Sequence, residues 1–453
     1  MPKTRPSIHP DERGFFQLYQ RSTDMKTLLY NCGEVAHLSN GNNEFPISGD
    51  YLHERENLVH LPGMCIMIDD SVISKIGPME DLLTEYAPWY PVKSENSDTK
   101  VIDLGGMAVV PGFVDCHTHL IWSGDRSSEL AMRVSGKSYK DIANSGGGIM
   151  KTVHETRSSP QNELVGKGIR RVKSALKNGT TTMESKSGYG LDLDSEVKIL
   201  EAISLVDRST KCDIHPTWLG AHDFPSEYGR KEYVEHLISD QLPVISELSL
   251  AKWVDVFCED GWFSNEETEE VVKAAKTYDL ESRLHVDEFS DSGGLALAAE
   301  LGSVSGDHVA CSNEDSRISA AESGTLQTFL PGTPYTLGKK IDLPIDQCVE
   351  EDWPFAIATD FNPNCPIISM PFIGSILSHR IGIDPLISLI AATRNPATSL
   401  NCDETIGVIC EGAKADLNVL WSSKSDSWCQ TPGNSPASMT FKNGNIVNSN
   451  EVY

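Results

Sequence analysis

The sequence is short of positive charge and has no long apolar run. Its 453 residues include 38 lysines and arginines against 65 aspartates and glutamates, which gives a formal net charge of -27 at pH 7. A field of this sign repels nucleic acids and anionic membrane surfaces. No stretch reaches the roughly 18 consecutive apolar residues of a transmembrane helix. We therefore expect neither nucleic acid nor membrane as a partner, and an anionic ligand would need local cations in its pocket.

The sequence also lacks the paired cysteines of a disulfide framework or a cysteine zinc site. Its eleven cysteines are scattered from Cys32 to Cys429 without a Cys-x-x-Cys pair. This usage is typical of a reducing compartment, so we expect a cytoplasmic protein. Residues 1–25 show no apolar core followed by a small-residue cleavage site, and we interpret them as a tail or surface extension.

From about residue 108, the sequence repeats a pattern of strand and helix. Short runs rich in β-branched residues each end in a polar cluster, and segments with helical periodicity separate them. The eight runs are AVVPGFVDCHTH, TTTMESKSGYG, DIHPTWLGAH, WVDVFCEDG, SRLHVDEF, SVSGDHV, GTLQTFLPG and PFAIATDFNPN. This order predicts the α/β class, with a (β/α)8 TIM-type barrel over residues 108–404. Ser264, followed by Glu266 and Glu267, should begin one of its helices.

The segments that flank the predicted barrel alternate in the manner of β-strands. Residues 26–107 and 405–453 contain short alternating runs separated by glycine and asparagine turns, including Asn443-Gly444. We expect these segments, from opposite ends of the chain, to pair into one small β-sandwich.

Residues that bind metals occur where the predicted strands end. In this type of barrel the carboxyl ends of the strands form the mouth, where the reactive groups lie. His117 and His119 are two residues apart on a strand, so their imidazoles point the same way. Two neutral nitrogens suit Zn²⁺ or another borderline divalent ion. A His-x-His pair alone also occurs without any metal in cores and on surfaces.

Three further strand ends strengthen the metal interpretation. His285 ends the fifth run, His308 follows Asp307 in the sixth, and Asp360 ends the eighth. Three nitrogens and one carboxylate oxygen, with a place left for water, make an open catalytic site that lowers the pKa of that water toward about 7. We expect no catalytic role for the histidines in tails, flanks, helices or the start of a strand, which are His9, His37, His53, His60, His154, His215, His236 and His379.

Several of these stretches resemble a known family. PGFVDCHTH, the later strand-end histidines and ATDFNP resemble the amidohydrolase superfamily, and over residues 105–420 the chain is similar to the imidazolonepropionases. The stretches that carry this similarity are DCHTHLIWSGDR, SYKDIANSGGGIMKTVHETR, GTTTMESKSGYGLD, LGAHDFPSEY, VDVFCEDGWFS, HVDEFSDSGG and TDFNPN. The resemblance implies hydrolysis of the ring C–N amide bond of 4-imidazolone-5-propanoate to N-formimino-L-glutamate in histidine degradation, by an enzyme that is often a homodimer.

The resemblance also implies a site, residue by residue. The ligands of a single Zn²⁺ or Fe²⁺ would be His117, His119, His285 and Asp360, and proton transfer would fall to Glu288 and His308. The substrate contacts would be Arg126, Tyr139, Tyr189, His222, Asn362 and Asn364. A second metal is not implied, because the fourth run ends FCEDG without the lysine that binuclear members carboxylate on a middle strand. Bacterial members usually place glycine and then serine or threonine where Asn364 and Cys365 stand here.

Two other functions are compatible with these residues. An aminohydrolase that deaminates a purine or pyrimidine shares the metal arrangement, and a non-catalytic barrel could use the metal structurally. Arg126 favours a ligand with a carboxylate over a bare heterocycle, because guanidinium binds carboxylate through two parallel hydrogen bonds. The free carboxylate of Glu288 favours an enzyme over a structural barrel.

Overall fold

The computed structural model describes residues 26–43, 45–91, 98–137, 141–142, 145–402 and 405–449. Its largest sheet has eight strands in sequence order, and every neighbouring pair is parallel. The strands are β8 (Phe113–Asp115), β9 (Thr180–Lys186), β10 (Asp213–Ala221), β11 (Trp253–Cys258), β12 (Glu281–Val286), β13 (Ser305–His308), β14 (Leu326–Phe329) and β15 (Phe355–Ile357). Seven of them lie within one of the eight runs recognised in the sequence, and β12 begins one residue before its run, at Glu281.

The segments after β8 and β15 join the two edges of this sheet. Thr118 and Phe361 form a parallel bridge. The N–H of His119 donates to the carbonyl of Phe361 over 2.8 Å, and the N–H of Asp360 donates to the carbonyl of His117 over 3.1 Å. These contacts confirm the predicted barrel, and they place the His-x-His segment directly beside Asp360.

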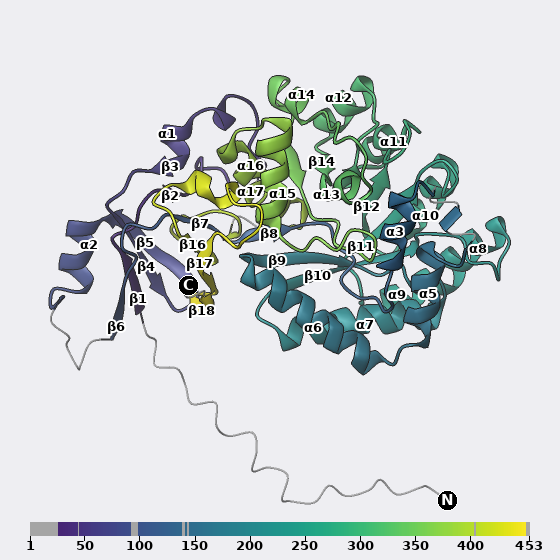
Figure 1. The fold of residues 1–453 in the computed structure, drawn as a ribbon, viewed down its shortest axis with the longest axis horizontal. Coiled ribbons are helices and arrows are strands. Elements are labelled where there is room, and N and C mark those ends of the chain that lie inside the picture. Colours follow the sequence, from purple (N-terminus) through teal and green to yellow (C-terminus); the bar gives the residue numbers. More distant parts are fainter. Residues whose placement is uncertain are drawn as a thin grey trace, which may run out of the picture.

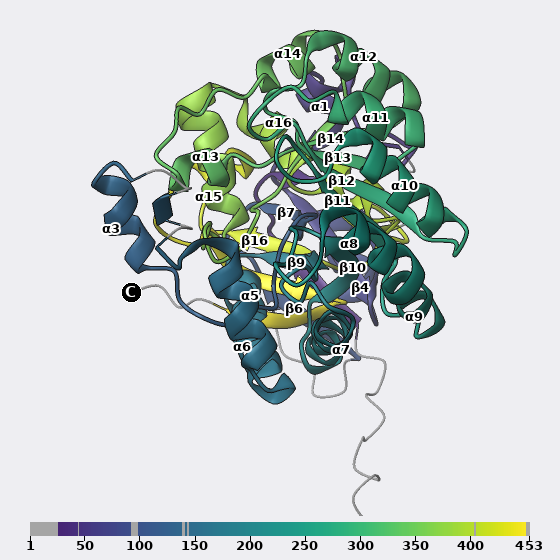
Figure 2. The ribbon, with the colours of Figure 1, turned by 90° about the vertical axis from the view of Figure 1, so that its right-hand side faces the viewer.

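Helices connect the strands and surround the barrel (Figures 1 and 2). They are α3 (Ser128–Val134), α5 (Gly148–Ser158), α6 (Gln161–Lys177), α7 (Leu193–Ser209), α8 (Arg230–His236), α9 (Leu242–Glu247), α10 (Asn265–Lys276), α11 (Gly294–Leu301), α12 (Glu314–Ser323), α13 (Gly332–Thr336), α14 (Ile345–Glu350), α15 (Met370–Ile376), α16 (Pro385–Ala391) and α17 (Arg394–Ser399). As predicted, α10 begins after Ser264, whose hydroxyl accepts from the N–H of Glu267 in a capping box. No described helix is long and apolar enough to cross a bilayer.

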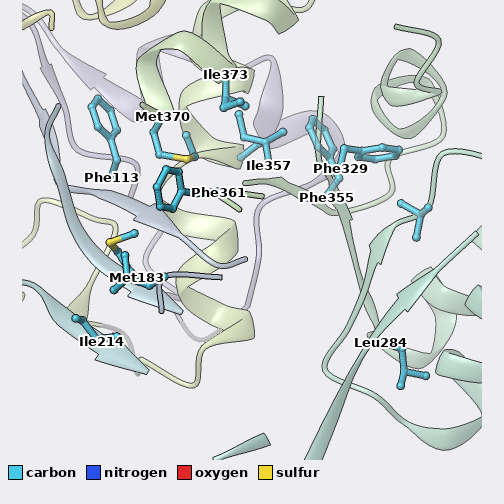
Figure 3. Packing of buried hydrophobic residues seen from close by; sticks show 14 of the residues in the cluster. Phe113, Met183, Ile214, Leu284, Phe329, Phe355, Ile357, Phe361, Met370 and Ile373 are labelled. Carbon is cyan, nitrogen blue, oxygen red and sulfur yellow. The ribbon is translucent and has the colours of Figure 1, made fainter. Parts of the chain in front are cut away.

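A continuous hydrophobic cluster packs the strands against these helices. Figure 3 shows part of it, including Phe329 of β14 and Phe355 of β15, whose ring centroids lie 6.1 Å apart. Ile373 of α15 and Ile357 of β15 belong to the same cluster. Burial of each such side chain contributes about 1.5–3 kcal/mol, so the cluster gives the strand ends a rigid support.

The chain before and after the barrel forms two more sheets, whose purple and yellow strands lie together in Figure 1. One has the order β5-β4-β1-β6 and the other the order β18-β17-β16-β7-β2-β3. The first half of the chain supplies β1 (Lys26–Tyr30), β2 (Val35–Ala36), β3 (Val59–His60), β4 (Met64–Asp69), β5 (Val72–Pro78), β6 (Thr99–Asp103), β7 (Val109–Pro111) and the helices α1 (Arg55–Leu58) and α2 (Met79–Tyr86). The end of the chain supplies β16 (Leu417–Leu420), β17 (Ala437–Lys442) and β18 (Asn445–Ser449).

Strands from both ends of the chain meet in the second of these sheets. There β16 pairs antiparallel with β7, and one hydrophobic cluster includes Leu29, Val109 and Leu417. The predicted Asn443-Gly444 turn joins β17 to β18, and both of its residues have the positive φ of a tight hairpin, 47° and 74°.

The domain boundaries 26–107, 108–404 and 405–453 stay a prediction, and the predicted tail over residues 1–25 lies outside the described residues. The run that begins at residue 108 contributes to two sheets, since β7 pairs with β16 and β2, whereas β8 pairs with β9. Gly112 separates β7 from β8. A Cβ atom there would lie 2.2 Å from Oγ1 of Thr181, so the chain passes at a point where only glycine fits.

The surroundings of His215, near the start of its strand, predict that the protein becomes less stable in acid. Its Nδ1 lies 2.8 Å from Nζ of Lys252, and burial together with this lysine lowers its pKa to about 4. The unfolded chain therefore binds more protons between pH 6.5 and 4, and the free energy of unfolding falls as the pH falls through this window. The measurement is the free energy of unfolding in urea at pH 7 and at pH 4.5. The decrease between these two pH values should be about 1–2 kcal/mol smaller in His215→Gln than in the unsubstituted protein.

The control for this prediction is His53→Gln, at an exposed position. It should leave the pH dependence as in the unsubstituted protein. An equal effect of the two substitutions would show that the half-buried site of His215 beside Lys252 is not the cause.

Candidate active site

Four side chains converge at the mouth of the barrel. His117 and His119 follow β8, His285 lies in β12, and Asp360 follows β15. The Nε2 atoms of His117 and His119 each lie 3.6 Å from Oδ1 of Asp360. One ligand atom from each of the three histidines lies within 4.8 Å of the others, and the same holds for His117, His308 and Asp360. The structure thus brings together all four residues predicted as ligands.

This donor set fits a divalent ion. Zn²⁺ with tetrahedral bonds of about 2.0–2.1 Å separates its ligand atoms by about 3.3–3.4 Å, close to the 3.6 Å between these nitrogens and Asp360. Nε2 of His117 is buried and has no hydrogen-bond partner among the described residues, which is unfavourable unless it binds a ligand. Burial also lowers the pKa of His117 and His119 well below the ordinary value, so both rings are neutral, as metal ligands must be.

Backbone strain also occurs at these strand ends. Asp360 and His308 have φ values of 50° and 75°, in the left-handed region that costs a residue with a side chain about 1–3 kcal/mol. Hydrogen bonds hold the first of these turns, because the hydroxyl of Thr333 donates to Oδ2 of Asp360 and the amide of Asn362 donates to its carbonyl. The strained backbone directs the Asp360 carboxylate toward the histidines.

Glu288 and His308 lie together beside the cluster. Oε2 of Glu288 is 3.6 Å from Nε2 of His308, and the Glu288 side chain is only 13% exposed. Burial, the Asp360 carboxylate and Glu259 raise the pKa of Glu288 well above the ordinary value. A solvent-exposed loop acid has none of these features, and the pair is placed to pass a proton.

The sequence did not single out Glu259, which positions the loop that carries Glu288. Its carboxylate accepts from the N–H groups of Glu288, Phe289 and Ser290 over 2.7, 3.1 and 3.1 Å. In the sequence, Glu259 is simply an acid that follows the predicted strand in FCEDG. Loop carboxylates are common at such positions, so nothing marked it as a positioning residue. The structure shows that its acceptor oxygens satisfy three backbone donors of the neighbouring loop.

A cavity of about 510 Å³ opens over the ligands. Its walls include three ligands, both proton-transfer candidates and five predicted substrate contacts: His119, His285, Asp360, Glu288, His308, Arg126, Tyr189, His222, Asn362 and Asn364. Tyr139, the sixth predicted contact, lies outside the described residues. The substrate-binding and metal-binding predictions therefore refer to one cavity.

Arg126 enters this cavity as half of an ion pair. Its Nε and Nη2 donate to the two carboxylate oxygens of Glu129 over 2.9 and 2.8 Å, in a buried fork. The sequence predicted Arg126 as the local cation for an anionic ligand, but Glu129 balances its charge. Three more cations line the cavity and were missed, namely Arg133, Lys137 and Lys339. The spacing of Arg133 and Lys137 after Arg126 was their only signal in the sequence.

Asn362 and Asn364 build one wall of the cavity. Oδ1 of Asn362 accepts from the N–H groups of Asn364 and Cys365 over 2.7 and 2.9 Å, which fixes the turn. Oδ1 of Asn364 accepts from Nη1 of Arg133 over 2.6 Å. Glycine, the usual residue here in bacterial members, would leave the Arg133 guanidinium without this acceptor. Asparagine at position 364 therefore holds a cation in the cavity wall. Cys365 is buried, with Sγ 3.6 Å from the carbonyl oxygen of Thr359.

His222 stacks on the ligand His119, with ring centroids 5.1 Å apart and an interplanar angle of 18°. Its Nδ1 lies 3.0 Å from the carbonyl oxygen of Gly188. A carbonyl only accepts, so Nδ1 carries the proton, and burial lowers the His222 pKa to about 3, which leaves the ring neutral. In that tautomer Nε2 is a hydrogen-bond acceptor.

Comparisons with known proteins agree with this geometry. Models described as "Amidohydrolase family" match residues 100–168 and 259–447. The imidazolonepropionase of Symbiobacterium thermophilum is 38% identical over 399 residues, which cover 87% of this chain and 90% of the relative. The imidazolonepropionase of Clostridium tetani is 34% identical over 402 residues, which cover 88% and 94%.

Solved structures share the fold. A 5-methylcytosine deaminase from Klebsiella pneumoniae superposes with a TM-score of 0.68 at 14% identity, over 94% of this chain and 98% of that one. A Xaa-Pro dipeptidase superposes with a TM-score of 0.62 at 16% identity, over 93% and 99%. At such low identity the likeness concerns the fold alone, whereas these two relatives are identical to this chain at more than a third of the aligned positions. The chain belongs to the imidazolonepropionase family of the amidohydrolases.

Proposed function

We propose that this protein hydrolyses the ring C–N amide bond of 4-imidazolone-5-propanoate and releases N-formimino-L-glutamate, a step of histidine degradation. The observation that carries the proposal is the cavity, which is lined both by the predicted metal ligands His119, His285 and Asp360 and by Arg126. A cyclic amide with a carboxylate tail needs both features at once. The relatives known as imidazolonepropionases agree with this substrate.

In this proposal the cations of the cavity bind the propionate. The fork to Glu129 holds Arg126 at the cavity, and Arg126, Arg133 and Lys339 together supply the positive charge there. Tyr189 and His222 then enclose the ring, which directs the ring carbonyl toward the ligand cluster. These contacts orient the substrate and lower the entropy cost of reaching the transition state.

A divalent ion held by His117, His119, His285 and Asp360 would act as a Lewis acid and lower the pKa of a water molecule. Zinc and ferrous iron both suit these donors. Glu288 accepts a proton from the attacking water, whose oxygen forms the new bond to the ring carbonyl carbon. His308, 3.6 Å from Glu288, helps return that proton to the ring nitrogen as its bond to the carbon breaks. One water molecule is consumed, and a carboxylate and a formimino nitrogen result.

The test is an assay of the purified protein with 4-imidazolone-5-propanoate, followed by the loss of ring absorbance, with metal content measured in parallel. Turnover that depends on bound metal is expected. Guanine and cytosine are tested beside it, because a deaminase of a purine or pyrimidine would use the same ligand set. Deamination of either base without turnover of the imidazolone would refute the proposal.

Arg126→Lys should raise KM by about 10- to 100-fold with a smaller change in kcat. Lysine keeps the charge but cannot make the two parallel hydrogen bonds to Glu129 that hold Arg126 at the cavity. A hydrogen bond to a charged group contributes about 1.5–3 kcal/mol. The matched control is Arg230→Lys, since Arg230 makes the same fork to Glu267 on the exposed surface. A KM unchanged by Arg126→Lys, or raised equally by the control, would argue against the contact.

The small-molecule substrate follows from the proposed reaction. The expected homodimer, the expected cytoplasmic location and the identity of the metal in the cell stay predictions. Measurement of the protein's mass in solution tests the homodimer, and metal analysis of the protein as isolated tests the identity of the metal.

A further inference from the structure

A cluster of buried charges lies behind the metal ligands. Lys186 is the last residue of β9, and its Nζ lies 2.7 Å from Asp255 of β11, 3.1 Å from Glu184 of β9 and 3.7 Å from Asp307 of β13. All four side chains are 0% exposed. The proposed reaction uses none of them.

Two of these carboxylates also contact metal ligands. Oδ2 of Asp307 accepts a hydrogen bond from Nδ1 of His117 over 2.6 Å. Oδ2 of Asp255 lies 3.0 Å from Nδ1 of His285, and its Oδ1 accepts from the backbone N–H of His285 over 3.1 Å. A carboxylate behind a ligand histidine fixes the ring orientation and the tautomer. Lys186 therefore contacts both carboxylates that orient ligand histidines.

Arg283 is the second cation of the cluster, but its hydrogen bonds go to backbone carbonyl oxygens. Its Nη1 and Nη2 donate to the carbonyl oxygens of Ser399 and Cys116 over 2.9 and 3.0 Å. Its Nε reaches Oδ2 of Asp307 only at 4.0 Å. Lys186 is thus the cation in close contact with Asp255, and the one that connects it to Asp307.

The charge of Lys186 is required where it lies. Burial disfavours an ammonium ion, but Asp255 and Glu184 outweigh this effect and raise the pKa of Lys186 above the ordinary value. A carboxylated lysine here would add a fourth anion to three carboxylates, so this residue is not the bridging lysine of a binuclear site. Without the ammonium, Asp255 and Asp307 would be buried anions with less compensation and would be driven to move.

We propose that Lys186 is a positioning residue of the metal site, which holds Asp255 and Asp307 so that these carboxylates orient the rings of His117 and His285. One ammonium couples the two ligands, although they lie on strands that are not neighbours in the sheet. The inference goes beyond the proposed function, because it concerns metal affinity and holds whichever ring the enzyme opens.

The test is Lys186→Met in the full chain, read as Zn²⁺ affinity by competition with a chelator. Loss of a residue behind the ligands typically weakens metal binding by about 10- to 100-fold, and this loss is expected here. In cobalt-substituted protein, the visible absorption spectrum should also change, because the ligand geometry changes. Neither readout needs a substrate. A protein that does not turn over the imidazolone would therefore refute the proposed reaction, but it would not affect the test of Lys186.

Lys442→Met is the matched control. Lys442 is also a buried lysine between two carboxylates, with Nζ 2.7 Å from Asp213 and 2.6 Å from Asp416. It lies in β17 of a flanking sheet, so its loss should lower stability and leave Zn²⁺ affinity within about twofold. Equal loss of affinity in the two variants would overturn the proposal.

The double variant Glu184→Gln with Lys186→Met covers the case in which Lys186→Met does not fold. It removes one anion with the cation and keeps both carboxylates that contact histidines. A folded double variant with weakened Zn²⁺ binding supports the positioning role, and Lys186→Arg should restore part of the affinity because it keeps the charge. Wild-type Zn²⁺ affinity in any folded variant without a cation at 186 would overturn it.

Discussion

Asp360→Asn is expected to remove the bound metal and to lower kcat/KM by about 10³-fold or more. Asp360 is the anionic member of the ligand set, and its Oδ1 lies 3.6 Å from Nε2 of both His117 and His119. Asparagine keeps the shape and can still accept from the hydroxyl of Thr333, but it offers the ion no negative charge. Without the metal, the water that attacks the ring is not activated near neutral pH. Metal analysis and the imidazolone assay on the same sample measure both effects.

Asp223→Asn is the control for this substitution. Asp223 follows β10 at the carboxyl side of the barrel, and burial raises its pKa to about 6, as burial also raises that of Asp360. It lies outside the ligand cluster, so metal content and turnover should change little. A full equivalent of metal in Asp360→Asn, with normal turnover, would show that this carboxylate is not a ligand.

Glu288→Gln should lower kcat by about 10²- to 10⁴-fold while the metal is retained. That range is typical of a general acid or base, and glutamine occupies the same space without accepting a proton. Glu288 is not among the predicted ligands, so metal content should match that of the unsubstituted protein. The distinguishing result is the combination of full metal with low turnover, which separates this residue from Asp360.

Asp260→Asn supplies the control for Glu288. Asp260 follows β11 near the same loop, where Ser290 contacts it over 3.4 Å, but its side chain is exposed. Removal of its charge changes the local field without touching the proposed proton path. Full turnover in Glu288→Gln, or an equal loss in Asp260→Asn, would remove Glu288 from the proposed mechanism.

Much of the barrel, and several polar residues at its mouth, followed from local patterns. A parallel strand that is buried on both faces needs a run of apolar and β-branched residues, and a polar residue is tolerated only where the strand reaches the mouth. His285 and Asp360 were therefore visible as polar endings of apolar runs. Ser264 was visible because a capping box is satisfied within one helical turn. These features depend on neighbours close in sequence, so the sequence predicts them well.

The residues that hold the site in place were not visible in this way. Glu129, Glu196 and Glu259 look like ordinary loop or helix acids, yet each accepts from backbone N–H groups of a loop around the cavity. Their partners lie from 5 to 31 residues away in the chain, and nothing in a local pattern marks an acceptor for a distant donor.

The sequence by itself predicted the eight strands and the mouth where the reactive groups lie, and its resemblance to the family implied four residues as ligands of one ion. Only the tertiary structure decided that Glu129 balances the charge of Arg126, that Asn364 holds Arg133 in the cavity wall and that Lys186 joins two ligand histidines through Asp255 and Asp307. The physical reason is that periodicity depends on burial along one strand or helix. The pairing of buried charges depends instead on which strands the closed barrel makes neighbours.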